Sequence, residues 1–499
     1  MFYKNKLKTK QLKYKLFNFE GFQNGINADI DDNIIPINQS KNSFNFSYKN
    51  GALSTGLGVK DVVINYNIEN PSLTKTLSTP AGTQILALWS QGTYFSQLAS
   101  VDRHLFAYCA DGKVYFNTLH YNSSDFLPLI NLLEMDEVPQ FITYYINGDK
   151  MYLFITKNGG LIAYYAFLTR YKLIENAPAI SSYCLHNNRM FVTDYNQPNR
   201  VWFSDEDDPT NWQLGDEQAG FIELHDERGN CLKVVSFEDY VYIFREFGIT
   251  RISSFKNTSN ITTQNMFVSG SRIIKDTICV CGDKIVFMTT DGLYSFNGNT
   301  CEKVNLKIDS WLKFVDKYSM AKFYNNAYYL TCKIDFNDNK VIGCEDELYT
   351  NNSLVKIDID SNEVSILRGV DITYLNNIVD VGINFLVGIV KEKGEYKVGM
   401  IVENGKVFND NSFKYWKSSP YDFGMPNKKK LIKNFYINSS ENIKVVFNSD
   451  GKITEIDVKG SEKNICISPN VSGYKIGVEI MSETANCNIS APQILVGYL

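Results

Sequence analysis

Short alternating runs of apolar and polar residues dominate the middle of the chain. Runs rich in Tyr, Phe, Val and Ile are separated by turns of Gly, Asn and Asp. This period of two predicts strands, and the turn residues between the runs predict antiparallel hairpins. Helical periodicity is scarce. We expect only two short helices, one in SDFLPLINLLEM near Leu129 and one in IDSWLKFVDKY near Trp311.

A loose internal repeat runs through the same region. Each copy is an apolar strand, a turn, and a second strand rich in aromatic residues. The copies are HLFAYCADGKVYFNTL, KMYLFITKNGGLIAYYAF, RMFVTDYNQPNRVWFSD, YVYIFREFGITRISSF, KIVFMTTDGLYSFNG and two degenerate ones, AYYLTCKIDFNDNK with SLVKIDIDSNEVSI, and NFLVGIVKEKGEYKVGMIVENGKVF. They recur about every 35 to 50 residues, the spacing of propeller blades. A four-stranded blade cannot bury both faces alone, so neighbouring blades must stack in a ring. Ile85 to Phe408 leaves room for about seven blades, within a range of about six to eight.

The two ends of the chain have different patterns. Residues 1–60 are polar and Asn-rich, and they predict an extended N-terminal arm that orders against a partner. The run VKDVVINYN is a candidate strand for closing the ring with the last blade. After a boundary near residue 410, alternating strands and an N-S-D-G turn predict a small antiparallel sandwich. The predicted fold class is therefore all-β: an arm (1–60), a β-propeller (61–410) and a C-terminal β-sandwich-like module (411–499).

Composition narrows the classes of function. The chain has 499 residues, 44% of them hydrophobic, and a formal net charge of −5. These values are typical of a folded globular protein and give no bulk electrostatic reason to bind nucleic acid. The basic opening MFYKNKLKTKQLKYK lacks the apolar region of a signal peptide. No apolar run reaches the roughly 18 residues that predict a membrane span.

Motifs of catalysis and cofactor binding are missing from the sequence. The four histidines form no HExxH or HxH, and there is no GxSxG or GxxxxGK[ST]. We expect no catalytic residue, no metal and no cofactor. The triplet Asp422-Phe423-Gly424 spells a kinase motif, but nothing else of a kinase accompanies it, so we interpret it as chance.

Two segments allow a metal site as an alternative. Cys279 and Cys281 would share one face of a strand, yet no second pair at zinc spacing accompanies them. We interpret the ten cysteines as mostly reduced and buried. DIDSNE, from Asp358 to Glu363, begins like a calcium loop but lacks its glycine and distal glutamate, so a blade turn is the favoured interpretation.

The stretch RVWFSDEDDPTNWQ, Arg200 to Gln213, combines acids with two tryptophans. A sialidase Asp box is one interpretation, because Asp207 and Trp212 have its spacing, but the Ser, Gly and Thr of that box are replaced by Asp205, Pro209 and Asn211. The alternative is a strand over Arg200–Ser204, a turn that begins at Asp208-Pro209, and Trp212 folded back as an apolar plug. We favour this second interpretation, with Asp205, Glu206 and Asp207 solvated.

Three segments carry a resemblance to a known family. Ser204 followed by Asp208-Pro209-Thr210-Asn211-Trp212 resembles a blade motif of β-propeller tail proteins of tailed bacteriophages, the nozzle, tail tubular and DNA-stabilising proteins below the portal. FEGFQNGINADIDDNIIPINQSKNSFNFSYKNGALSTGLGVKD resembles their N-terminal pattern, although Thr55-Gly56 stands where an arginine is usual. YWKSSPYDFGMPNKKKLIKNFYI resembles their strand into the C-terminal sandwich.

This resemblance implies a non-enzymatic virion component that is made in the bacterial cytoplasm. Its partners would be the portal or adaptor, other tail proteins, further copies of itself in a ring, and phage DNA in transit without sequence specificity. Lys428, Lys429 and Lys430 are then a candidate subunit interface, with a solvated strand edge as the alternative. Two other hypotheses stay open: a carbohydrate-binding or sialidase-like propeller, and an intracellular propeller scaffold.

Overall fold

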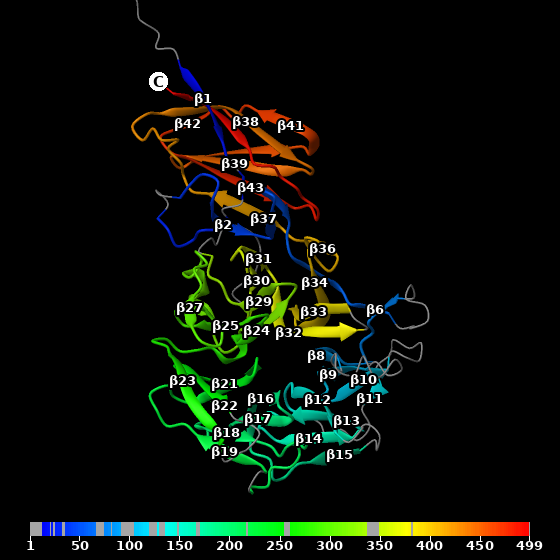
Figure 1. Ribbon diagram of the computed structural model, residues 1–499. Helices are drawn as coiled ribbons and strands as arrows, with labels where there is room; N and C mark the ends of the chain where they lie inside the picture. The colour runs from blue at the N-terminus through cyan, green and yellow to red at the C-terminus, as the bar shows by residue number, and fades with distance from the viewer. Residues whose placement is uncertain are drawn as a thin grey trace, which may run out of the picture.

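Strands make up almost all of the regular structure in the computed structural model (Figure 1). The structure describes residues 12–19, 21–22, 25–31, 35–65, 74–80, 82–90, 104–118, 127–128, 135–146, 149–165, 170–215, 218–253, 260–336, 349–380 and 383–498. The predicted all-β fold class is confirmed, because antiparallel four-stranded sheets follow one another along the chain in the manner of a β-propeller. None of the described helices is long and apolar enough to cross a membrane.

Six successive sheets are blades whose four strands are consecutive in sequence. Blades 1 to 3 are β8 (Ile85–Ser90), β9 (His104–Cys109), β10 (Val114–Thr118) and β11 (Leu127–Pro128); β12 (Gln140–Ile146), β13 (Asp149–Ile155), β14 (Leu161–Tyr165) and β15 (Arg170–Leu173); and β16 (Ile180–His186), β17 (Arg189–Asp194), β18 (Arg200–Phe203) and β19 (Gly220–Glu223). Blades 4 to 6 are β20 (Cys231–Phe237), β21 (Tyr240–Arg245), β22 (Gly248–Ser253) and β23 (Thr262–Val268); β24 (Cys279–Cys281), β25 (Lys284–Thr289), β26 (Gly292–Phe296) and β27 (Cys301–Lys303); and β28 (Met320–Tyr324), β29 (Ala327–Cys332), β30 (Ser353–Asp358) and β31 (Val364–Arg368). The predicted repeats are the second and third strands of these sheets.

The seventh blade needs a strand from the start of the chain. It contains β32 (Asp371–Asp380), β33 (Ile383–Glu392) and β34 (Glu395–Val402), and next to β34 lies β5 (Gly58–Asp61), followed by the short β35 (Lys406–Val407) and β36 (Asp410–Asn411). β5 is antiparallel to β34, with Gly58 opposite Val402 and Asp61 opposite Gly399. The expectation that VKDVVINYN helps to close the ring is confirmed for its first residues.

Buried apolar clusters account for every interface of a seven-membered ring. One cluster joins blades 7 and 1, through residues such as Phe385 and Ile85. Further clusters join blades 1 and 2, 2 and 3, 3 and 4, and 4 and 5. Blades 6 and 7 share another, and blades 5 and 6 belong to the largest. The ring is thus closed by side-chain packing on both faces of each sheet.

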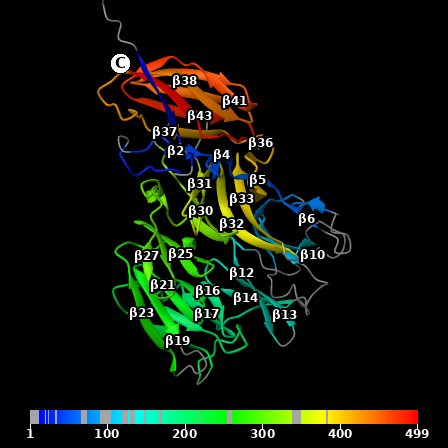
Figure 2. The same cartoon turned by 45° about the horizontal axis from the view of Figure 1, so that its top comes forward.

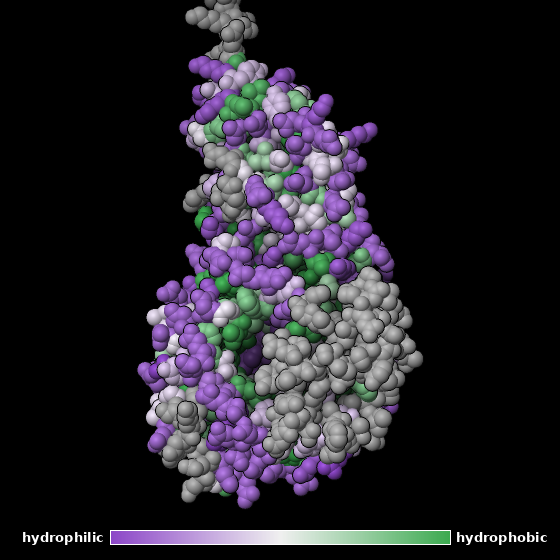
Figure 3. All heavy atoms as spheres, turned by 45° about the vertical axis from the view of Figure 1, so that its right-hand side comes forward, coloured by the Kyte–Doolittle hydropathy of each residue, from purple (hydrophilic) through white to green (hydrophobic). Residues whose placement is uncertain are grey.

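A two-sheet sandwich sits on one end of the propeller, with the C-terminus and β1 at its far end (Figure 1). One sheet contains β1 (Lys13–Asn18), β44 (Gln493–Tyr498), β38 (Lys430–Ser439), β41 (Ser461–Ile467) and β42 (Val471–Gly473). The other has the order β2 (Ser40–Phe44), β37 (Lys414–Ser418), β43 (Ile476–Ser482), β39 (Ile443–Ser449) and β40 (Lys452–Val458). Its core is continuous with that of blades 5 and 6. Figure 3 shows hydrophilic residues over most of the described surface of the sandwich in that view.

The N-terminal segment differs from the expected arm. Within residues 12–65, β1 and β2 belong to the two sandwich sheets, β3 (Phe46–Lys49) and β4 (Ala52–Thr55) form a hairpin, and β5 joins blade 7. Figure 2 shows β2, β4 and β5 following one another from the sandwich to the propeller. The physical reason is the alternation in SKNSFNFSYK, which buries Phe44, Phe46 and Tyr48 against this chain's own core. A further hairpin pairs β6 (Val63–Asn65) with β7 (Thr74–Thr76).

One of the two expected short helices is present in the described residues. The segment at Trp311 forms a 3-10 helix, η3 (Trp311–Phe314), as expected, whereas a second 3-10 helix before blade 5, η2 (Lys275–Thr277), was not expected. Leu129, the centre of the other expected helix, lies outside the described residues, and the neighbouring Leu127–Pro128 is the strand β11.

Candidate functional site

The DPTNW segment forms a closed turn after β18. Asp208 Oδ1 accepts hydrogen bonds from the Thr210 backbone N–H and hydroxyl at 2.9 and 2.7 Å, and the Asn211 N–H donates to the Asp208 carbonyl at 3.2 Å. Pro209 is buried, and Trp212 is 3% exposed in the cluster between blades 2 and 3. Ser204 is fully buried and its hydroxyl accepts from the Met190 N–H at 3.0 Å. The geometry is that of a structural turn.

Of the three acids beside this turn, two are exposed to solvent and the third forms hydrogen bonds within the turn. Glu206 and Asp207 are exposed, and Asp207 has the positive φ of 60° that a tight turn requires. Asp205 is only half-exposed, which corrects the expectation that it is solvated. Its carboxylate accepts from the Asn211 side-chain amide at 3.0 Å and from the Glu206 N–H at 2.8 Å, and these bonds tie the two ends of the turn together.

The three lysines of the C-terminal module do not form one surface. Lys428 and Lys429 are exposed, and Lys428 Nζ lies 5.0 Å from the ring centroid of Tyr498. Lys430 begins β38, is 1% exposed, and donates to the Tyr474 carbonyl. Burial lowers its pKa. Only the first two lysines are therefore available to a partner, and which partner they meet stays a prediction.

The candidate metal segments have other uses in the structure. Asp358 Oδ1 accepts from the backbone of Asp360 and Ser361, at 3.1 and 2.8 Å, within the hairpin between β30 and β31. Cys279 is half-buried and Cys281 buried on β24, and the nine described cysteines are all free. Among the described residues, no three His, Cys, Asp or Glu side chains gather as metal ligands. Asp422 accepts from the Gly424 N–H in a turn whose Phe423 packs on Phe17.

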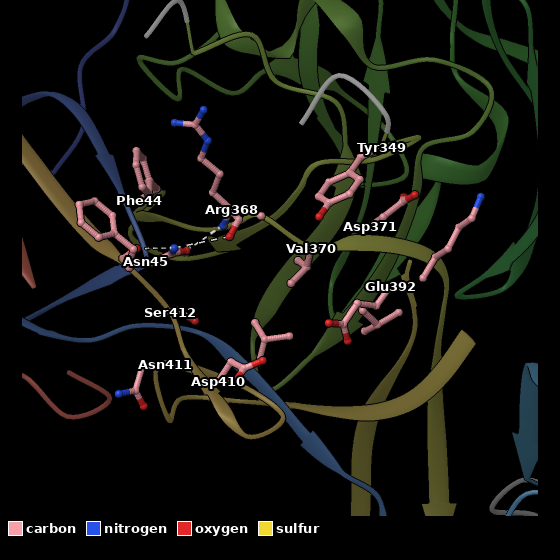
Figure 4. Close-up of a pocket in the computed structure, with 15 residues that line it drawn as sticks. Phe44, Asn45, Tyr349, Arg368, Val370, Asp371, Glu392, Asp410, Asn411 and Ser412 are labelled. Carbon is pink, nitrogen blue, oxygen red and sulfur yellow. Dashed lines mark hydrogen bonds between the residues drawn. The ribbon is translucent and has the colours of Figure 1, made fainter. Parts of the chain in front are cut away.

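The junction between propeller and sandwich contains a cavity of about 270 Å³ (Figure 4). It is formed where the end of β2 meets blades 6 and 7 and the linker to the sandwich. Phe44, Asn45, Arg368, Asp371 and Ser412 are among its lining residues. Its walls thus come from the N-terminal segment, the propeller and the linker to the sandwich.

Asn45 is the residue that joins these three parts. Its Oδ1 accepts from the Arg368 N–H at 2.7 Å, its Nδ2 donates to the Phe413 carbonyl at 2.7 Å, and its own N–H donates to the Ile366 carbonyl at 2.7 Å. Asn45 has a φ of 61°, a conformation that asparagine tolerates better than most residues. A Cβ on Gly56 would lie 2.1 Å from the Asn45 carbonyl oxygen, so this crossing also requires a glycine.

Arg368 and Asp371 complete the walls with groups that already have partners. The Arg368 guanidinium lies 4.0 Å from the ring centroid of Phe336 and 4.7 Å from that of Phe44. Asp371 is 2% exposed and accepts from the N–H groups of Asn351 and Thr350 at 3.0 and 3.2 Å. The cavity therefore lies at a structural joint, and the polar groups in its walls already hold other parts of the chain. Sequence reasoning missed Asn45 and Arg368, although the pattern G-x-L-x-x-G-x-G around Gly56 was a signal of a close crossing.

Comparisons with known proteins give matches of structure only. No family model matches the chain, and no curated protein sequence matches it. The chain is similar to the AfRom2 CNH domain (10% identity, TM-score 0.40, covering 66% of this chain and 98% of that one). It is similar to Chaetomium thermophilum Raptor (8%, TM-score 0.42, 70% and 29%) and to Saccharomyces cerevisiae Sqt1 (10%, TM-score 0.39, 64% and 95%).

Proposed function

We propose that this chain is a non-enzymatic connecting protein, and specifically a structural component of a phage or prophage tail. In that role it joins the portal or adaptor to more distal tail parts, in a ring of identical copies around the DNA path. It is made in the bacterial cytoplasm and acts in the virion. The resemblance of three segments to phage tail propellers supports this proposal, and each of them forms a joint or turn of the fold.

The observation that carries the connecting role is the path of residues 12–65. One continuous segment supplies a strand to each sandwich sheet and then the closing strand of blade 7. A mechanical force on the sandwich is therefore transmitted to the propeller through this segment, which is hydrogen-bonded to strands of both parts. Such continuity suits a protein that transmits load between neighbours, and it gives no advantage to an isolated binding module.

The proposal is tested by the assembly state of the purified full-length chain. We expect negative-stain electron microscopy and mass photometry to show a discrete ring-shaped oligomer. We expect weak binding to duplex DNA at physiological salt, because the net charge is −5 and each phosphate contact would need a cation. Monomers at all concentrations that neither assemble nor join tail proteins would contradict the proposal.

The two exposed lysines allow a direct test of the assembly surface. Lys428→Gln with Lys429→Gln removes two exposed charges and leaves the buried Lys430 and its bond to Tyr474 intact. Reduced ring formation with unchanged DNA binding supports an interface at this edge. Reduced DNA binding with normal assembly would move these lysines to the DNA path, and no change in either would leave them as a solvated strand edge.

An intracellular propeller scaffold is the second candidate function. The observation that favours it is that the ring is complete within one chain, since β5 supplies the missing strand of blade 7. A closed propeller needs no neighbouring copy to be stable and can present its faces to other proteins. A stable monomer that binds a cellular protein would favour this candidate, whereas glycan turnover by a monomer would favour a carbohydrate-active propeller.

A further inference from the structure

The first strands of the blades lie next to one another and form the inner wall of the ring. β16 contacts β20, β24 contacts β28, β28 contacts β32, and β32 contacts β8. Each of these strands pairs on one side only, with the second strand of its own blade. Side chains at these positions therefore meet across blade boundaries near the ring axis, where they either bond to each other's backbone or line the central space.

One half of this inner wall is held by neutral groups. The Asn376 side-chain amide on blade 7 donates to the Leu88 carbonyl on blade 1 at 2.9 Å. Gln140 on blade 2 donates to the Ser181 carbonyl on blade 3 at 3.0 Å, and the Tyr183 hydroxyl donates back to the Phe141 carbonyl at 2.8 Å. Neutral side chains are thus sufficient to tie neighbouring blades together here.

The other half carries three lysines from three consecutive blades. Lys233 lies on β20, Lys275 lies in η2 directly before β24, and Lys322 lies on β28, and all three are half-buried. Lys233 Nζ donates to the Ile278 carbonyl at 2.8 Å. Lys275 Nζ reaches from blade 5 to blade 3, where it donates to the Ser181 carbonyl at 2.7 Å and hydroxyl at 2.9 Å.

Hydrogen bonds and strand contacts place these three side chains in one region of the inner wall. Lys233 bonds to Ile278 directly before β24, and β24 contacts β28, which carries Lys322. Lys275 bonds to Ser181 on β16, which contacts β20, the strand of Lys233.

Burial lowers the pKa of Lys275 and of Lys322, and the positive charge of Lys233 lowers both pKa values further, while Asp276 acts in the opposite direction. Cys279 belongs to the same region. Its hydrogen bond with Cys281, and then the charges of Lys322 and Lys233, lower its pKa below the ordinary thiol value although burial opposes this.

The positive charge of the cluster exceeds its compensation. Within the part of the chain that the structure describes, no ion pair joins any of the three lysines to a carboxylate. The negative charge of Asp276 acts on Lys275 and Lys322, and that of the Cys279 thiolate acts on Lys322. Burying three cations with fewer negative charges beside them is costly, and the neutral half of the wall shows that ring closure does not require it. Ammonium groups converging from separate elements are a common means of binding phosphate.

We propose that blades 4, 5 and 6 form an oxyanion site at the inner wall of the propeller, in which Lys233, Lys275 and Lys322 bind the phosphate group of a small ligand. The ligand class is an ion or metabolite with a multiply charged phosphate. This proposal is independent of the role in a phage tail, because it concerns a site within a single propeller.

Pyrophosphate is a suitable probe for this site. Isothermal titration calorimetry on the full-length protein, with sodium chloride at matched ionic strength as the reference, should detect saturable pyrophosphate binding. Lys322→Gln should weaken that binding about tenfold or more, because it removes one of the three ammonium groups. The control is Lys444→Gln, which removes a charge from the sandwich surface and should leave the affinity unchanged.

Binding that is absent from the wild-type protein, or equal in Lys322→Gln and Lys444→Gln, would overturn the proposal. A second readout does not depend on the variants. Pyrophosphate should slow the alkylation of Cys279 by iodoacetamide, measured by peptide mass spectrometry, while the exposed Cys466 reacts at its usual rate. Saturable binding that leaves the reactivity of Cys279 unchanged would place the anion elsewhere and would also overturn the proposal.

Discussion

Blades 3 and 7 solve the same structural problem in different ways. Blade 3 takes its four strands from consecutive segments, Ile180–His186 to Gly220–Glu223. Trp212, from a local turn, completes the core that blade 3 shares with blade 2. Blade 7 has three local strands and takes the next from Gly58–Asp61, near the start of the chain. The first blade depends on local sequence, whereas the second depends on contacts between distant segments.

The difference shows where the molecule is held together. Perturbing blade 3 should destabilise the propeller through lost packing. Perturbing the closure of blade 7 should affect propeller and sandwich together, because residues 12–65 belong to both. The following substitutions probe each side of this comparison, beginning with the largest expected effect.

Trp212→Ala should cost about 3–5 kcal/mol of unfolding free energy, as for other buried aromatic residues. Trp212 is 3% exposed and packs in the cluster that joins blades 2 and 3. The nearby Leu214 is 56% exposed, so Leu214→Ala is a matched control that should cost less than about 0.5 kcal/mol. Urea denaturation measures both, and similar losses from the two variants would refute the role of Trp212 in the core.

Gly58→Ala should cost about 1–3 kcal/mol, since overpacking at a close crossing forces the backbone to move. An added Cβ would lie 2.1 Å from Asn404 Oδ1 and 2.3 Å from the Lys406 carbonyl oxygen. Gly477→Ala in the sandwich is the control, because its Cβ would meet nothing closer than 3.8 Å. Hydrogen exchange should show faster exchange in both β5 and β34 of the Gly58 variant, and unchanged exchange in β34 would contradict the closure.

Asp205→Ala should cost about 1 kcal/mol, the contribution of a typical hydrogen bond. The carboxylate accepts from the Asn211 side chain and the Glu206 N–H, so its loss loosens the turn that places Trp212. Asp207→Asn serves as the control, since Asp207 is exposed and asparagine tolerates its positive φ. Thermal unfolding distinguishes them, and an Asp205→Ala variant as stable as wild type would restore the solvated interpretation.

Glu403→Gln should have the smallest effect, below about 1 kcal/mol, and that effect should depend on pH. Burial tends to raise the pKa of Glu403, but hydrogen bonds from Lys356 and Lys49 outweigh it, and the pKa is lowered below its ordinary value. Lys49 belongs to the N-terminal hairpin and Lys356 to blade 6, at 3.0 and 2.7 Å from the carboxylate. A group with a lowered pKa stabilises the fold above its unfolded pKa and ceases to do so as the pH falls. The difference in unfolding free energy from wild type should therefore be present at pH 7 and shrink below about pH 4.5. A difference that grew on acidification would contradict a stabilising role for the contacts of Glu403 with Lys49 and Lys356.

Local signals made much of the fold predictable. The alternating strands and their turns identified the hairpins of all seven blades, because period-two burial is a property of neighbouring residues. The DPTNW turn was also visible, since proline and aspartate set its geometry locally. The pairing of β5 with β34 could be anticipated only as a candidate, because strand register between distant segments depends on packing and not on local pattern.

Features that depend on three-dimensional neighbours could not be predicted. Lys430 looked like its exposed neighbours Lys428 and Lys429, yet alternation along β38 turns it into the sandwich. The stacking of Arg368 between Phe44 and Phe336 joins three separate parts of the chain. The lysines of the inner wall come from three blades, and no single segment of sequence shows that they converge.

The central claim is that residues 12–65 bind propeller and sandwich into one cooperative unit. Differential scanning calorimetry of the full-length protein tests it most directly. The account predicts a single transition whose calorimetric and van't Hoff enthalpies agree, because the sandwich shares its core with blades 5 and 6 and its strands with the segment that closes blade 7. Two separate transitions, with the sandwich unfolding while the propeller stays folded, would contradict it.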